Sequence, residues 1–295
     1  MIWRFLMVYL LSAIAANLIM TFLMRYSEHH DGNRYALNIW NYLAGTLISI
    51  IFLKDKSVIF SGDFITLFLG IINGIGFVTA LVLIQISIRR NGAPLTTTFN
   101  RLGILIPTIL SAFLFGEIPS PLKIIGLALC IFAIIIMNTG DNTNRPDFMT
   151  GLILVFLLGG TLDFISRVYS LYYNADSQTC FVMYTFLSAL VVSIIIFLKD
   201  GHKMTLRDSI IGIGVGIPNQ LTTLLILRAA AFLPAYIVYP TYSAGLIIFV
   251  NVINYIAFKE MLSKKQYIAT AIIGLGLVFI KVITTTSSGG LFLTL

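Results

Sequence analysis

The sequence has 295 residues, a length that in a soluble protein would indicate one large or two medium domains. Apolar residues make up 58% and charged residues only 11%, whereas about a quarter of an average soluble domain is charged. The mean hydropathy of +0.96 agrees with this excess of apolar residues. The composition therefore excludes a soluble globular protein and predicts a multi-pass membrane protein, most simply of a prokaryotic plasma membrane.

The net charge of +7 does not indicate a nucleic-acid partner, because the basic residues are scattered over short connections and form no stripe with interleaved aromatic residues. Cys130 and Cys180 lie in or beside separate apolar runs and predict neither a disulfide nor a metal site. The adjacent His29 and His30 have no convergent third ligand, so no metal is expected. We expect no cofactor.

Ten apolar runs are each long enough to cross a bilayer core about 30 Å thick as a helix. They are continuous and not alternating, which indicates helices and not the strands of a barrel. The predicted spans are 2–24, 35–53, 63–88, 94–115, 121–138, 149–172, 178–198, 207–230, 234–258 and 264–283.

The first run resembles a signal peptide, with small residues at 12–16, but its apolar character continues to Leu23. We therefore interpret it as a retained helix. The connections between the runs are too short to hold a soluble domain. The last residues, 284–295, are rich in Ser, Thr and Gly and are predicted to be a flexible tail.

The sequence repeats itself at an almost constant offset. The segment Ile-Ile-Phe-Leu-Lys-Asp at 50–55 recurs at 195–200. Gly74 and Gly76 correspond to Gly214 and Gly216, and similar pairs join Pro94 to Pro234 and Glu117 to Glu260. These pairs occur in one order and indicate two copies of a five-helix unit, 1–138 and 149–283.

An odd number of helices per copy means that the second copy crosses the membrane in the opposite direction. The predicted fold is thus all-α, with ten transmembrane helices as two inverted five-helix repeats. Such repeats are typical of secondary transporters, whose site lies near the membrane midplane and opens to each side in turn.

The stretch from Pro107 to Glu117, an apolar helix with a proline that ends in a small-x-Glu corner, resembles the drug/metabolite transporter superfamily of the ten-helix EamA type. The second copy departs from this pattern, with Val250 where a proline is expected and Lys259 in place of Gly116. The resemblance implies export or exchange of small metabolites, without a cofactor or nucleotide hydrolysis.

Basic residues are unequally divided between the two sides. Odd-numbered connections carry 11 Lys and Arg, whereas even-numbered connections and the termini carry 6. The positive-inside rule then predicts cytoplasmic odd connections and external termini. The first repeat alone gives a tie, so the orientation stays open while the two termini are expected on the same side.

Charged residues within the spans are costly and mark candidate functional sites. Asp163 and Arg167 lie four residues apart on one helix face and can pair. Two interpretations remain open: a self-neutralising structural pair, or an Asp163 that carries a proton or cation and exchanges Arg167 for substrate. Arg101 either extends its side chain to the membrane edge or, beside Asn100, binds a substrate carboxylate or phosphate.

Uncharged polar residues also recur at mid-depth, and each can join helices or contact a ligand. The tyrosines of the ninth span can form ordinary packing or close over a flat or cationic substrate. The complete set of predicted substrate-binding residues is Asn17, Asn41, Asn73, Asn100, Arg101, Asp163, Arg167, Asn219, Gln220, Tyr239 and Tyr242.

The leading hypothesis is a secondary-active exporter or exchanger of a small polar or amphipathic metabolite, such as an amino acid, with proton coupling through Asp163. An uptake carrier for a sugar or quaternary amine and a multidrug exporter remain open. A membrane-embedded enzyme or a channel is the alternative from another class, although the clustered carboxylates or metal ligands of such an enzyme are absent from the sequence. We expect a small-molecule substrate, a lipid environment and a monomer or homodimer.

Overall fold

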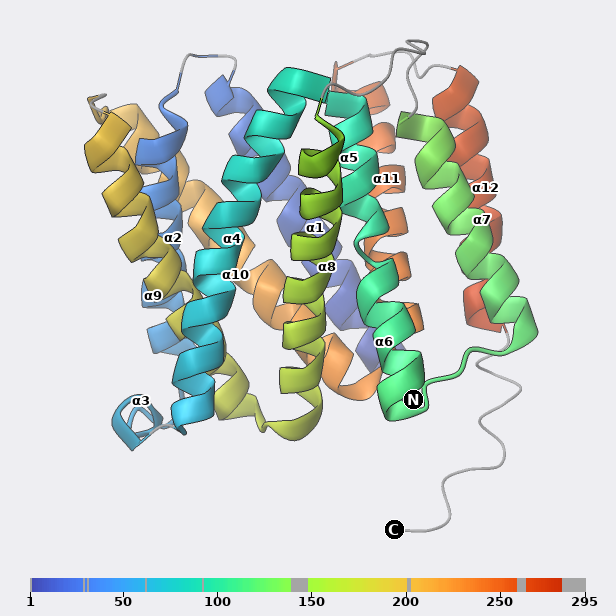
Figure 1. Cartoon of the computed structure of the whole chain (residues 1–295), viewed down its shortest axis with the longest axis horizontal. Helices are drawn as coiled ribbons and strands as arrows, with labels where there is room; N and C mark the ends of the chain where they lie inside the picture. The colour runs from blue at the N-terminus through green and yellow to red at the C-terminus, as the bar shows by residue number, and fades with distance from the viewer. Residues whose placement is uncertain are drawn as a thin grey trace. The chain divides into compact units, whose positions relative to one another are not determined.

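A computed structural model describes residues 2–28, 30, 32–61, 63–91, 93–138, 148–200, 203–258 and 264–282 (Figure 1). Over these residues the only regular secondary structure is helical. The helices are α1 (Ile2–Glu28), α2 (Arg34–Phe52), α3 (Val58–Ser61), α4 (Phe64–Asn91), α5 (Ala93–Leu102), α6 (Leu105–Phe115), α7 (Pro121–Asn138), α8 (Met149–Tyr172), α9 (Ala175–Asp200), α10 (Leu206–Phe232), α11 (Ala235–Phe258) and α12 (Lys264–Val282). The all-helical prediction is confirmed.

Each of the ten predicted spans corresponds to a helix or, for the fourth, to the pair α5 and α6. Six segments of the described chain are long and apolar enough to cross a membrane, and Thr96–Phe115 counts as one of them. Shorter apolar helices cover Val8–Met24, Pro121–Ile136, Ala235–Val250 and Tyr267–Ile280. The one-turn helix α3 was not predicted. The predicted tail, 284–295, lies outside the described residues.

The break in the fourth span has its cause at Pro107. In a continuous helix the residue 107 amide would donate to the Gly103 carbonyl, but proline has no N–H and its ring collides with that carbonyl. The Gly103 carbonyl instead accepts from the Ile106 amide at 3.0 Å, while the Gly103 amide donates to the Asn100 carbonyl at 3.2 Å. This tight turn ends α5 directly after Arg101 and Leu102.

Other helix ends carry recognisable caps. The Asn33 side chain accepts from the Tyr35 and Ala36 amides at the start of α2. Thr205 and Asp208 form a capping box at the start of α10. α6 ends at Gly116, whose φ of 67° is the left-handed conformation that glycine adopts without strain. The Glu117 carboxylate of the same corner accepts from the Ala235 amide at 2.8 Å and so caps α11.

The chain forms two compact units. Unit 1 comprises residues 1–82 and 165–233, and unit 2 comprises 83–164 and 234–295. Each unit draws helices from both predicted repeats, and α4 and α8 each contribute to both units. A compact unit groups residues by contact, whereas a repeat relates copies of a sequence, so the inverted repeat stays a prediction.

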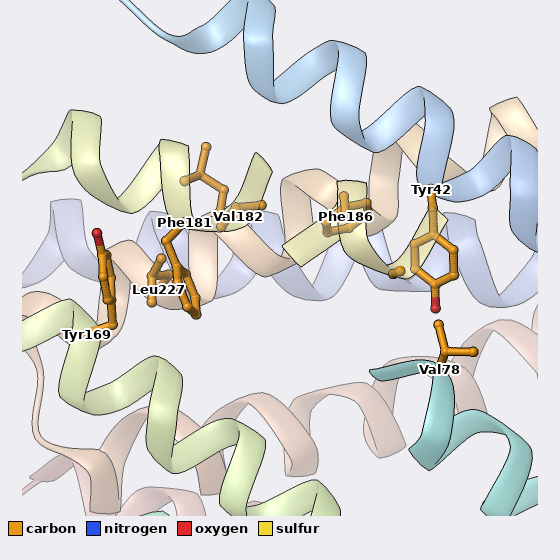
Figure 2. Close-up of a cluster of buried hydrophobic side chains, with 9 residues drawn as sticks. Tyr42, Val78, Tyr169, Phe181, Val182, Phe186 and Leu227 are labelled. Carbon is orange, nitrogen blue, oxygen red and sulfur yellow. The ribbon is translucent and has the colours of Figure 1, made fainter. Parts of the chain in front are cut away.

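Unit 1 is organised around α10, which packs against α1 and α2, while α9 packs against α2, α3 and α10 (Figure 1). α10 approaches α2 closely at Gly212, where an added Cβ would lie 2.6 Å from the Leu37 carbonyl oxygen. Gly212 therefore allows α10 and α2 to pack closely. Figure 2 shows the apolar core of the unit, which includes Tyr42, Val78, Tyr169, Phe181, Val182, Phe186 and Leu227.

Unit 2 contains a second pair of closely packed helices, α7 and α12, which lie side by side (Figure 1). Gly126 and Gly276 face each other across this pair, since a Cβ on Gly126 would lie 2.7 Å from the Gly276 carbonyl oxygen. Close approach through small residues is the usual way in which membrane helices associate. Large apolar side chains such as Phe113 and Phe64 are exposed, as expected for surfaces in contact with lipid.

Candidate functional site

The centre of the candidate site is Asp163 on α8. Fourteen residues of α8 precede it, which places it about 21 Å along the helix axis from Met149. Its side chain is half-buried. Asp163 therefore lies in the middle part of a helix, Met149–Tyr172, that is long and apolar enough to cross a membrane.

Arg101 supplies the opposite charge. It lies in the last turn of α5, just before the break that Pro107 enforces, and its charge acts on Asp163. Both residues belong to unit 2. The sequence singled out both charges but did not predict that they interact, because nothing in their spacing of 62 residues relates α5 to α8.

Close helix packing explains how α5 reaches α8. A Cβ on Gly160 would lie 2.5 Å from the carbonyl oxygen of Gly103, so the two backbones approach without side chains between them. One position earlier, a Cβ on Gly159 would lie 3.4 Å from Oδ1 of Asn100, which places the Asn100 amide beside α8. The tight turn after α5 and the glycine pair of α8 thus bring Asn100 and Arg101 to the same part of unit 2.

Two tyrosines of α11 complete this group. The buried Tyr239 donates from its hydroxyl to the Asp163 backbone carbonyl at 2.8 Å. The half-buried Tyr242 interacts electrostatically with both Arg101 and Asp163. Five predicted residues from three helices therefore gather in unit 2, and we call them the charged cluster: Asn100, Arg101, Asp163, Tyr239 and Tyr242.

Arg167, the predicted partner of Asp163, belongs to unit 1. The residue is 2% exposed, and its Nη1 donates to the Leu233 carbonyl at 3.0 Å, at the end of α10. This bond satisfies a backbone carbonyl that the last turn of a helix leaves without a partner. The exchange of Arg167 for substrate at Asp163 stays a prediction.

The remaining predicted residues are amides of unit 1, and we call them the amide cluster: Asn17, Asn41, Asn73, Asn219 and Gln220. Asn219 Nδ2 donates to Asn41 Oδ1 at 3.0 Å, which joins α10 to α2. Gln220 Nε2 donates to Ser49 Oγ at 3.2 Å, and Asn17 Oδ1 accepts from Thr21 at 3.4 Å within α1.

Two acceptors of the amide cluster are buried without a hydrogen-bond partner, Asn73 Oδ1 and Gln220 Oε1. Asn73 is completely buried, and its Nδ2 donates to Thr185 Oγ1 at 3.4 Å. A buried acceptor without a partner is costly, and such atoms call for a water or ligand donor. Ser49 and Thr185 were missed as part of this cluster, because a hydroxyl in an apolar run gives little signal in the sequence.

No group of three or more His, Cys, Asp or Glu side chains that could hold a metal ion occurs among the residues that the structure describes. His29 of the adjacent histidine pair lies outside those residues.

Comparison with known proteins gives a family and a fold. Residues 3–139 match the EamA-like transporter family, a segment that nearly coincides with the predicted first repeat, 1–138. No curated protein matches significantly. A solved structure described only as "Crystal structure of protein" shares 14% identity with a TM-score of 0.74, and the match covers 94% of this chain and 99% of that chain.

At 14% identity the structural match shows the fold alone. The family match, by contrast, relates residues 3–139 to a class of transporters. EamA-like proteins are membrane transporters of the drug/metabolite type, and a small-molecule substrate in a membrane environment follows from this. The chain is a multi-pass helical membrane protein whose residues 3–139 match the EamA-like transporter family, which confirms the predicted resemblance to the drug/metabolite transporter superfamily.

Proposed function

We propose that the protein is a secondary-active exporter or exchanger that moves a small polar or amphipathic metabolite, such as an amino acid, by alternating access. The observation that carries this proposal is the charged cluster, which places a guanidinium, a carboxylate and two phenols of α5, α8 and α11 together in unit 2. Charges inside a membrane are retained where they bind or move a solute.

The chemistry of the charged cluster favours a substrate that carries both a carboxylate and an ammonium group. The planar guanidinium of Arg101 offers a fork of donors to a carboxylate, and Asp163 offers an acceptor to an ammonium group. A zwitterion would replace the Arg101–Asp163 interaction with one bond to each charge and leave neither charge unpaired. The phenol ring of Tyr242 adds a face to which an ammonium group is attracted.

Proton coupling is part of the proposal. A carboxyl group in the membrane interior is stable without its charge when no cation faces it, and with its charge when one does. Asp163 therefore suits a cycle in which a proton and the substrate occupy the site alternately. The amide cluster of unit 1 is a separate set of candidate substrate contacts, with Asn73 Oδ1 and Gln220 Oε1 as buried acceptors.

Counterflow in proteoliposomes tests the transport proposal. The purified protein is reconstituted in vesicles preloaded with one of a panel of amino acids, sugars, quaternary amines or nucleosides, and uptake of the labelled compound is followed. We expect transient accumulation with an amino acid. Accumulation only with sugars or quaternary amines would favour an uptake carrier for those compounds, and accumulation with many unrelated amphipathic cations would favour multidrug export.

The same vesicles separate the other classes of protein. A channel gives efflux that does not depend on substrate on the other side, and a membrane-embedded enzyme changes the compound chemically. A protein reconstituted in folded form that shows no exchange with any member of the panel would contradict the proposal. We place the protein in a prokaryotic plasma membrane as a monomer or homodimer, and fractionation of the native host tests the location.

A further inference from the structure

Lys123 is a buried cation that the proposed transport mechanism does not use. It is the third residue of the apolar helix α7 and is only 6% exposed. A lysine so close to the end of a membrane helix ordinarily extends its side chain to the membrane edge and keeps its ammonium group in water. The side chain of Lys123 is buried instead, so its charge needs partners within the site.

The partner that Lys123 has is uncharged. Its Nζ donates to the Tyr236 hydroxyl at 3.3 Å and lies 5.1 Å from the centre of the Tyr236 ring. Among the residues that the structure describes, no carboxylate forms an ion pair with Lys123. Glu117, the acidic residue nearest to it in the sequence, accepts from the Ala235 amide at 2.8 Å. An ammonium group has three N–H donors, so one phenol acceptor leaves two of them for a ligand.

Two hydroxyl groups at this corner of unit 2 can donate as well. The Tyr236 hydroxyl accepts from Lys123, and its own proton can therefore be given to another group. Ser120 directly precedes α7, and its Oγ is buried without a hydrogen-bond partner. A serine in this position usually caps the first turn, where its side chain faces that of the third helical residue, here Lys123. A buried hydroxyl that forms no such cap calls for a ligand or a water.

The chemistry of these groups determines the kind of ligand. One ammonium group and two hydroxyls provide several hydrogen-bond donors and a single positive charge. A buried positive charge without a counter-charge is costly, and an anion with more than one acceptor oxygen would compensate the charge and satisfy the donors together. Phosphate and carboxylate groups meet both requirements.

We propose that Lys123, Ser120 and Tyr236 form an anion-binding site that takes a phosphate or carboxylate group. The three residues come from the start of α7 and the first turn of α11, and all belong to unit 2. The group can belong to a free anion or to the headgroup of an anionic lipid, because the site lies at the end of an apolar helix. The site shares no residue with the charged cluster and does not depend on the proposed transport function.

Thermal unfolding of the full chain in an uncharged detergent tests the site. Inorganic phosphate or acetate is added while sodium chloride keeps the ionic strength constant. In a second arm phosphatidylglycerol is added to the micelles, with phosphatidylcholine as the control lipid. We expect a saturable rise of the unfolding midpoint, which gives an apparent dissociation constant. A rise with phosphate or acetate indicates a free anion, a rise only with phosphatidylglycerol indicates a lipid headgroup, and no saturable rise in either arm would overturn the proposal.

Variants assign the binding to this site. Lys123→Gln removes the charge but keeps a donor for the Tyr236 hydroxyl, and it should raise the apparent dissociation constant about tenfold, as expected for one charge-assisted hydrogen bond. Lys123→Arg keeps the charge and should retain binding, whereas Ser120→Ala should weaken it about fivefold, the effect of one ordinary hydrogen bond. Lys264→Gln, at an exposed lysine that begins α12 in the same unit, is the matched control. An unchanged constant in Lys123→Gln would overturn the proposal.

A second measurement uses the parent protein and does not depend on the folding of any variant. Its lysines are acetylated with a small amine-reactive ester, and peptide mass spectrometry gives the rate at each position with and without phosphate, acetate or phosphatidylglycerol. A bound anion should slow the acetylation of Lys123 in proportion to the occupied fraction of the site and leave that of Lys264 unchanged. Equal protection of both lysines, or of neither, would contradict the site.

These measurements are separate from the test of transport. Midpoints and acetylation rates are obtained without vesicles or a gradient, and the probes need not be transported. Counterflow by a protein in which Lys123 binds no anion would overturn the site alone. Anion binding at Lys123 in a protein without counterflow would overturn the transport proposal alone.

Discussion

The backbones of Gly160 on α8 and Gly103 after α5 touch, because a methyl group on Gly160 would lie 2.5 Å from the Gly103 carbonyl oxygen. It would also lie 2.6 Å from Cδ1 of Ile106. This contact holds the turn that carries Asn100 and Arg101 against the helix that carries Asp163. The geometry of the charged cluster thus depends on Gly160, a residue without a side chain that could bind substrate.

Gly160→Ala is expected to lower the stability of the protein by about 1–3 kcal/mol, the usual cost of adding a methyl group to a filled space. Gly159→Ala is the control, because its Cβ would have ordinary contact at 3.4 Å with Asn100. Since Ala favours a helix over Gly by up to about 1 kcal/mol, this variant should be neutral or slightly stabilised. Thermal unfolding in one detergent measures both, and equal midpoints would contradict the close packing.

Arg101→Gln should raise the Michaelis constant for a substrate with a carboxylate by about tenfold, which corresponds to one charge-assisted hydrogen bond. Initial rates of exchange in proteoliposomes give this constant. Arg89→Gln, which removes an exposed charge from the last turn of α4, is the control and should not change it. An unchanged constant in a folded Arg101→Gln protein would remove Arg101 from the site.

Asp163→Asn should abolish substrate movement driven by a pH gradient while substrate exchange at equal pH continues, because the amide cannot carry a proton. The comparison of the two modes in the same vesicles is the measurement. Asp55→Asn, at an exposed carboxylate outside the spans, should affect neither mode. Gradient-driven transport that survives in Asp163→Asn would exclude this residue as the proton carrier.

The connection between α8 and α9 should respond to alkaline pH. Burial raises the pKa of Tyr173, and the hydrogen bond from its hydroxyl to Asp63 Oδ2 at 2.8 Å, together with the negative charge of that residue, raises it further. Because the folded state holds this proton more tightly than the unfolded state, the contribution to stability is complete below the ordinary tyrosine pKa of about 10. It is lost as the pH rises through the higher pKa of the folded state.

Difference absorbance between the parent protein and Tyr173→Phe reports the titration of this one phenol. In Asp63→Asn the midpoint of the difference titration should move to lower pH, since the negative charge near the phenol is gone. A midpoint that stays in place would show that burial alone raises the pKa of Tyr173.

Much of the fold could be predicted from the sequence because the membrane imposes one requirement on every span. A run of about 20 apolar residues must satisfy its backbone hydrogen bonds within itself, and a helix is the solution that a single run can reach alone. For this reason the predicted bounds agree closely with helices such as α2 and α8. The break between α5 and α6 was also encoded locally, in Pro107, although the sequence analysis predicted a single span over 94–115.

The candidate site was less accessible to prediction. Charges within apolar runs are conspicuous, so Arg101, Asp163 and Arg167 were found at once. Their partners were not found, because a helical spacing of four relates only neighbours on one helix. The interaction between Arg101 and Asp163 and the Tyr239 bond to the Asp163 carbonyl join residues far apart in the sequence.

Composition and hydropathy alone determined that this chain is a helical membrane protein. They also set where its spans begin and end, since each span must match the thickness of the bilayer and satisfy its own backbone hydrogen bonds independently of the others. The tertiary structure decided which polar groups meet. Glycine contacts fix how closely two helices approach, and that distance determines whether the charge of Arg101 acts on Asp163 and whether Asn219 donates to Asn41. Such contacts depend on two distant segments at once, and no pattern within one segment specifies them.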